Sequence, residues 1–359
     1  MMPRKGTTMP QFGRCAVATL LGAAIAVTAP VKGIALTLDE VVAKAKQEGQ
    51  VRLGIAPRKE ISGRPVATRM FEVFQKRYPF IKINYERVSG FGQREKIFSE
   101  MVGGVVNYDV LSLSTRQIDD GIKANIFQAV DWKGLKVDPE SVHPGNFGVT
   151  YRMEPYGISY NTDMIKEAEG QRLTWEDCAN PKWKGKVAVI DRPRHLEVLY
   201  QNNAWGREKT LDYARRLAAN NPIVERSRDE AFTKLVKGAY PMLCGDRAQG
   251  VLFDNAMGLK NVGISFPEPV PIVHVTFMFV PRAAKSPNSG ILWIAWALSE
   301  EGQKIHDETE FTGNPLMPSS VVYKRIKGKK IPGISWDFLA RSDDILREIL
   351  TAMGFPIVQ

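Results

Sequence analysis

The chain has 359 residues, of which 44% are hydrophobic and 25% are charged, and its formal net charge at pH 7 is +10. This composition is that of a globular protein, and the sequence holds no low-complexity tract or internal repeat, which argues against a disordered or fibrous chain. Basic and acidic residues are interspersed along the whole sequence, so the positive charge gives little support to a nucleic-acid-binding protein.

The first 35 residues have the order of a secretory signal peptide. Three basic residues precede or open an apolar run over 15–29, and Gly33-Ile34-Ala35 supplies the small residues of a cleavage site. Cys15 begins the apolar run instead of following a small-residue motif at its end, which argues against a lipoprotein. The run is shorter than the ~20 residues of a spanning helix. We expect cleavage after Ala35 and a free periplasmic protein.

Removal of this leader takes away four basic residues and no acidic one, so the formal charge falls from +10 to +6. An anionic small partner or a solvated basic surface accounts for an excess of this size. The 324 residues that remain exceed the size at which a single hydrophobic core stops growing, so two domains are expected.

The first unit of the mature chain alternates helices and strands. In chain order we predict a helix ending at Gly49, a strand over 50–55, a helix over 64–78, a strand over 81–88, a helix over 94–102 and a strand over 110–113. Alternation at this spacing predicts a parallel sheet flanked by helices. A loop rich in Pro, Gly and Asp over 130–148 then interrupts the pattern.

A second α/β unit follows. It contains predicted strands over 156–161, 186–190 and 240–244, with helices near 163–169, 197–205, 208–219 and 227–238 between them. Pro241 indicates that the strand over 240–244 lies at a sheet edge. After three prolines, an apolar run over 272–280 leads to two helices rich in Trp, Leu and Ile and to a last amphipathic helix over 343–353.

The two breaks indicate that the chain leaves the first unit, builds the second and returns. We therefore expect a signal peptide over 1–35, a first lobe beginning with 36–150, a second lobe over 151–270, and a return to the first lobe with C-terminal helices over 271–359. Two crossings side by side form a hinge. Ligands of open parallel sheets lie beyond the carboxyl ends of the strands, so a cleft between the lobes is the expected site.

Cys178 and Cys244 are the cysteines left after export. An oxidising compartment allows them to form a disulfide. Their spacing alone does not decide between a disulfide and two buried thiols.

Four loops that follow predicted strands share hydroxyl, glycine and arginine residues. Free backbone N–H groups at helix starts favour anions, and arginine is well shaped to bind a carboxylate or phosphate. Together with Tyr156 near the hinge and two polar residues after the strand over 240–244, these loops predict an anion site formed by Arg58, Ser89, Gly90, Ser114, Thr115, Arg116, Tyr156, Arg192, Arg194, His195, Asp246 and Arg247. Ordinary helix capping and solvated charge are the alternative for each loop taken alone.

Catalytic and metal motifs are missing from the sequence. It has no G-x-S-x-G, H-E-x-x-H or G-x-x-x-x-G-K, and its four histidines show no metal-ligand spacing. We therefore expect a binding protein without a cofactor or a resident metal, and an exported enzyme on the same scaffold is the less favoured alternative.

The segment Thr174-Trp-Glu-Asp-Cys-Ala-Asn-Pro-Lys-Trp-Lys-Gly-Lys-Val-Ala-Val189 resembles the W-x-D-L-x-x-P-K-W-K-G-K-V segment of bacterial extracellular solute-binding proteins. It is most similar to the ferric-iron and related small-anion receptors of ABC-type importers. Segments 46–51, 156–161 and 299–303 agree with the same family. The resemblance implies an α/β fold of the type II periplasmic-binding-protein class, with two lobes, a hinge and a ligand cleft, and delivery of the solute to an inner-membrane ABC permease.

Iron-binding members of that family typically carry two neighbouring tyrosines in the second half of the chain. Here Tyr200, Tyr213 and Tyr240 stand apart, and the segment 313–320 has no tyrosine. The loops favour an organic acid, a phosphorylated compound or a phosphonate. Ferric-ion binding is the alternative, and a sensory role at the membrane stays open. We expect a monomer with a small anionic ligand, an ABC permease as partner and no nucleic acid.

Overall fold

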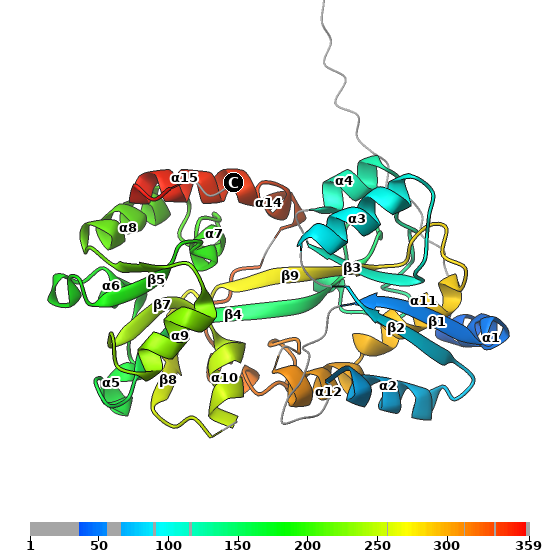
Figure 1. Cartoon of the computed structure of the whole chain (residues 1–359), viewed down its shortest axis with the longest axis horizontal. Helices are drawn as coiled ribbons and strands as arrows, with labels where there is room; N and C mark the ends of the chain where they lie inside the picture. The colour runs from blue at the N-terminus through cyan, green and yellow to red at the C-terminus, as the bar shows by residue number, and fades with distance from the viewer. Residues whose placement is uncertain are drawn as a thin grey trace, which may run out of the picture.

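Two lobes lie side by side in the computed structural model of the chain, joined by two long strands (Figure 1). The structure describes residues 36–55, 66–88, 91–114, 117–256, 258–311, 313–333 and 335–356. The predicted signal peptide lies outside these residues. No helix within the described ranges is long and apolar enough to cross a membrane.

Lobe 1 is built on three parallel strands, β2, β1 and β3, in that order. Its elements are α1 (Leu38–Glu48), β1 (Gln50–Ile55), α2 (Val66–Arg77), β2 (Lys82–Arg87), α3 (Phe91–Val102), β3 (Val110–Ser114), α4 (Ile118–Lys123), η2 (Pro139–Ser141), α11 (Pro287–Ala297) and α12 (Glu300–Glu310). The predicted alternation of helix and strand is confirmed here. Thr37 and Glu40 form the capping box that starts α1, and Gly49 ends that helix with a left-handed backbone.

Two antiparallel strands, β4 (Val149–Asn161) and β9 (Ile272–Phe279), cross between the lobes. β9 pairs with β3 in lobe 1, whereas β4 pairs with β7 and β8 in lobe 2. β4 is longer than the strand predicted over 156–161. Its first half carries Arg152 and Glu154 among apolar residues, and the predicted strand begins only after this half.

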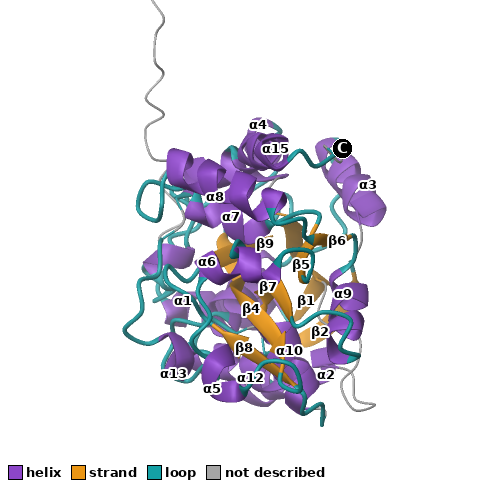
Figure 2. Cartoon of the chain, turned by 90° about the vertical axis from the view of Figure 1, so that its left-hand side faces the viewer, coloured by secondary structure: helices purple, strands orange, loops and turns teal. Residues whose placement is uncertain are grey.

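Lobe 2 has the strand order β4, β7, β5 and β6, with β8 beside β4, and helices lie on both sides of its sheet (Figure 2). Its further elements are α5 (Glu167–Gly170), α6 (Trp175–Cys178), η3 (Pro181–Trp183), β5 (Val187–Ile190), α7 (Arg194–Leu199), α8 (Arg207–Ala219), β6 (Ile223–Glu225), α9 (Arg228–Val236), β7 (Met242–Arg247), α10 (Ala248–Ala256) and β8 (Val262–Ser265). β7 lies inside the sheet between β4 and β5, so the edge position predicted from Pro241 is wrong. Pro241 precedes the first residue of the strand, where its missing N–H breaks no ladder bond.

The chain ends with α13 (Tyr323–Ile326), α14 (Trp336–Ala340) and α15 (Ser342–Met353). The sequence left the lobe of these helices open. Ile345, Ile349 and Met353 of α15 join the hydrophobic core of lobe 2, against α7 and α8. Trp336 instead packs edge-to-face on His143 of lobe 1, with ring centroids 4.9 Å apart. The C-terminal segment therefore contacts both lobes.

Cys178 and Cys244 form a disulfide that joins α6 to β7, with the two Cα atoms 6.2 Å apart. Both residues are buried in the core of lobe 2. This resolves the choice that the sequence left open. The bridge holds β7 at Cys244, three residues before Arg247. Arg247 is the last residue of the strand, at the end that faces lobe 1.

Candidate functional site

A carboxylate shared by two arginines lies on the crossing strand β4. Arg152 Nη2 donates a hydrogen bond of 2.8 Å to Glu154 Oε1, and Arg247 Nη1 lies 3.7 Å from the same oxygen. The Glu154 side chain is 4% exposed, whereas those of Arg152 and Arg247 are 19% and 33% exposed. Glu154 is thus covered by the two guanidinium groups, which keep contact with solvent.

Arg194 approaches this group from the first turn of α7. Its Nε lies 3.7 Å from Glu197 Oε1, and its side chain is 26% exposed. Burial disfavours the charge of Arg194, but Glu197, Tyr156 and Glu154 around it raise its pKa on balance. Tyr156 is buried on β4, directly opposite Arg247 in the ladder between β4 and β7.

Arg94 in the first turns of α3 faces the group from lobe 1. Burial lowers its pKa, and repulsion by Arg152 and Arg87 lowers it further. Its Nε atom is buried without a hydrogen-bond partner in the structure. Arg94 therefore lies among other guanidinium groups and has one buried donor without an acceptor. This position suits an anion that is not part of the chain.

We call these side chains the arginine cluster. Its seven members are Arg87, Arg94, Arg152, Glu154, Arg194, Glu197 and Arg247. Five guanidinium groups and two carboxylates give it a formal charge of +3. The cluster joins residues of lobe 1, the crossing strand and lobe 2, and α3 and α7 lie on the same side of the crossing strands (Figure 1).

Of the cluster members, Arg194 and Arg247 were predicted from the sequence, as was the adjacent Tyr156. The other five members were not predicted. The position of Arg94 in the sequence marks it as a candidate site residue, because it lies one helical turn after a strand-to-helix loop. Arg152 and Glu154 alternate with Tyr151 and Met153 along a strand, and this alternation of charged and apolar residues signals a strand with one polar face.

Five predicted site residues lie outside the described part of the chain: Arg58, Ser89, Gly90, Thr115 and Arg116. Ser114 is the last residue of β3 and is half-buried, and its backbone N–H donates to Gln117 Oε1 at 3.3 Å. Arg192 is exposed in the turn before α7.

Asp246 and His195 are buried beneath the surface that carries the cluster. Asp246 is 1% exposed, and its carboxylate accepts hydrogen bonds from Arg228, Ser159 and the Arg247 backbone. The His195 ring stacks on Trp175 with centroids 5.0 Å apart, and burial lowers its pKa to about 3. Both residues therefore lie in the packing of lobe 2, beneath the side chains of the cluster.

No group of three His, Cys, Asp or Glu side chains that could hold a metal ion occurs among the residues that the structure describes. Burial also raises the pKa of Tyr156, the tyrosine beside the cluster, so its hydroxyl stays protonated. Hard trivalent metal ions prefer anionic oxygen ligands, and the described side chains at the arginine cluster are mainly cationic.

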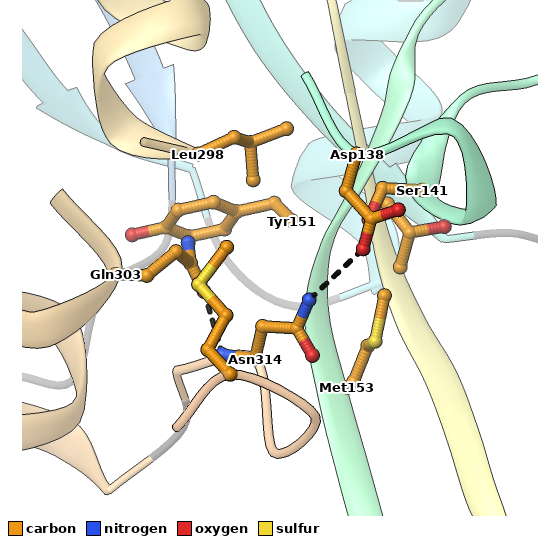
Figure 3. Close-up of a pocket in the computed structure, with 9 residues that line it drawn as sticks. Asp138, Ser141, Tyr151, Met153, Leu298, Gln303 and Asn314 are labelled. Atoms are coloured by element: carbon orange, nitrogen blue, oxygen red, sulfur yellow. Dashed lines mark hydrogen bonds between the residues drawn. The ribbon is translucent and has the colours of Figure 1, made fainter. Parts of the chain in front are cut away.

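A small polar cavity of about 10 Å³ lies on β4, where the strand meets the end of α11 and α12 (Figure 3). It has room for about one water molecule, so it is too small for a solute. Asn314 closes one side through a hydrogen bond from its backbone N–H to Gln303 Oε1 at 2.6 Å. Two larger surface grooves, one near α14 and one near α1, contain no member of the arginine cluster.

Residues 107–342 match the family described as bacterial extracellular solute-binding protein. The chain belongs to this family. The resemblance recognised in the sequence is thereby confirmed, and members of the family act outside the bacterial cytoplasm.

Among curated proteins, an uncharacterized protein of Haemophilus influenzae is 23% identical over 172 residues, which cover 45% of this chain and 48% of that protein. The chain thus spans about half the length of this relative. Among solved structures, IdiA (FutA) of Trichodesmium in complex with iron and citrate is 17% identical over 86% of this chain and 100% of that one, with a TM-score of 0.67. Iron-bound HitA of Pseudomonas aeruginosa is 17% identical over 84% and 99%, with a TM-score of 0.64. These similarities confirm the predicted type II periplasmic-binding-protein fold.

Proposed function

We propose that this solute-binding protein is the periplasmic receptor of an ABC-type importer and that it captures a small anionic solute at the arginine cluster. The observation that carries the proposal is Arg94. Its guanidinium lies near two others, and burial of its Nε leaves that donor without a partner in the structure. A solute carboxylate, phosphate or phosphonate would supply the missing acceptor and relieve the repulsion.

Capture follows from the position of the cluster on both lobes. Arg94 belongs to lobe 1 and Arg194 to lobe 2, so an anion that binds both stabilises the arrangement in which the lobes are close. The crossing strands β4 and β9 supply the hinge. The closed receptor would then deliver its solute to an inner-membrane permease. We propose that it works as a monomer and returns the solute chemically unchanged.

The test is a thermal-shift and calorimetric screen of carboxylates, phosphates and phosphonates against the protein without its first 35 residues. Arg94→Ala and Arg194→Ala are each expected to weaken a detected ligand at least tenfold, as loss of a charge-assisted hydrogen bond predicts. Arg69→Ala is the matched control, since Arg69 lies on α2 with a side chain 59% exposed. A screen without any ligand, or equal affinities for all variants, contradicts the proposal.

Ferric iron is the second candidate, because similar solved structures are described as iron-bound. The described residues favour a negatively charged complex of the metal over the bare cation, since a bare cation would be repelled by the cluster. Iron with citrate, which is present in one of these structures, has the required character. Titration with Fe(III) alone, citrate alone and the mixture separates the cases: binding of Fe(III) alone, with a tyrosinate absorption band, would favour the metal-ion receptor.

A further inference from the structure

The structure places a carboxylate of the chain inside its own anion site. Glu154 Oε1 accepts from Arg152 at 2.8 Å and lies 3.7 Å from Arg247. Because Glu154 is part of the chain, it loses no translational freedom when it binds these arginines, whereas a free solute does. A solute with a single carboxylate therefore gains little by competing with Glu154 for Arg152 and Arg247.

Arg94 and Arg194 come from opposite lobes, and the Nε atom of each is buried without a hydrogen-bond partner. Arg194 Nε lies 3.7 Å from Glu197 Oε1, which is beyond hydrogen-bond distance, so both donors are available to a solute. A single negative charge placed between them leaves the cluster with a formal charge of +2, or +1 when the neighbouring Asp343 is counted. A second negative charge on the same solute lowers this excess and lets separate oxygens bind the two lobes at once. The gain from the second charge is large where the site is partly shielded from water, as at these half-buried arginines.

We infer that the solute carries at least two negative charges, as a phosphoryl, phosphonate or dicarboxylate compound does, and that Glu154 sets this requirement by occupying Arg152 and Arg247. The inference rests on the proposed anion-binding function. Glu154 acts here as a specificity-determining residue that rejects monoanions.

The charge requirement is tested with methyl phosphate, whose second pKa lies near 6 as in other phosphomonoesters. Calorimetry from pH 5 to pH 8 is expected to show its affinity rising by up to about tenfold as the dianion forms. The ionisable groups that face the arginines are the cluster members Glu154 and Glu197 and the neighbouring side chains of Asp343, Tyr156 and His195. Sulfate, which is a dianion throughout this range, reports their contribution, and its affinity is expected to change less than threefold.

A second arm compares succinate with propionate, which differ by one carboxylate. Succinate is expected to bind at least tenfold more tightly. If no probe binds, the proposed function itself fails. If propionate and the monoanion of methyl phosphate bind as tightly as the dianions, the proposed function stands and the charge requirement is wrong.

The role of Glu154 is tested with Glu154→Gln, which keeps a hydrogen-bond acceptor for Arg152 but removes the negative charge. Propionate is expected to gain at least tenfold in affinity, which lowers the preference for succinate. Glu225→Gln is the matched control, since the Glu225 side chain is 6% exposed, pairs with Lys234 outside the arginine cluster, and loses the same charge. If both variants gain equally in affinity for propionate, the net charge of the protein sets the selectivity and not the position of Glu154. If neither variant gains, Glu154 has no part in selecting the solute. Circular dichroism and the binding of sulfate confirm that each variant is folded.

Discussion

Arg228 Nε donates a hydrogen bond of 2.8 Å to Asp246 Oδ1, and this ion pair connects α9 to the end of β7. The Asp246 side chain is fully buried and that of Arg228 is 13% exposed. Arg228 also lies over the Phe232 ring, 4.1 Å from its centroid. The pair is therefore part of the packing of lobe 2, one residue before Arg247 of the arginine cluster.

Asp246→Ala is expected to lower the free energy of unfolding by about 3–5 kcal/mol, because it leaves the Arg228 guanidinium buried without its main counter-charge. Urea denaturation followed by tryptophan fluorescence measures the change. Arg247→Ala is the neighbouring control, with an expected loss below about 1 kcal/mol since that side chain is one-third exposed. Equal losses for the two variants would contradict the view that Asp246 supports the packing of lobe 2 whereas Arg247 does not.

Gly245 is required by close approach to His195. Its φ is +73°, and a Cβ atom on Gly245 would lie 2.1 Å from His195 Nδ1. Gly245→Ala is expected to cost about 2–4 kcal/mol, since overpacking adds to the cost of a left-handed backbone. Gly328→Ala is the matched control: its φ is +80° and nothing lies within 4 Å of the added atom. The control should lose only about 1 kcal/mol in denaturant unfolding, and similar losses at both glycines would refute the steric argument.

The disulfide between Cys178 and Cys244 closes a loop with a sequence separation of 66 residues. Chain-entropy arguments assign about 4 kcal/mol to a loop of this length. The double variant Cys178→Ala with Cys244→Ala is therefore expected to unfold at a clearly lower denaturant concentration than the oxidised wild type. Reductant should move the wild-type midpoint toward that of the double variant and leave the double variant unaffected. An unchanged wild-type midpoint after verified reduction would contradict this account.

The fold could be predicted from the sequence because the signals that begin and end helices and strands are local. The capping boxes at Thr37 and Thr174 and the helix end at Gly49 each depend on neighbours in the chain, and the predicted helix end at Gly49 is confirmed. The arginine cluster depends on distant residues. Arg94 and Arg152 come together only because β4 crosses from one lobe to the other, and Asp246 is withdrawn from solvent by Arg228, eighteen residues earlier. The composition of a loop after a strand marks candidate residues, but it does not tell which of them are exposed at the cluster and which are buried beneath it.

Acid destabilisation should follow from buried neutral histidines. Burial lowers the pKa of His195 to about 3 and that of His274 to about 4, against an ordinary value of 6.5. Between pH 6.5 and these values the unfolded chain binds protons that the folded chain does not. The stability contribution is thus complete above pH 6.5 and is lost as the pH falls toward 4 and 3.

His195→Leu removes one of these groups, so its free energy of unfolding should depend less steeply on pH. Each such histidine contributes up to about 1.4 kcal/mol per pH unit, and the variant should lose a slope of this order between pH 6 and pH 4. Urea denaturation at pH 8, 7, 6, 5 and 4 measures it, with the values at pH 8 as the baseline that separates lost packing from lost titration. Parallel curves for the wild type and the variant would show that folding does not lower the pKa of His195, which is incompatible with its buried position between Trp175 and Tyr156.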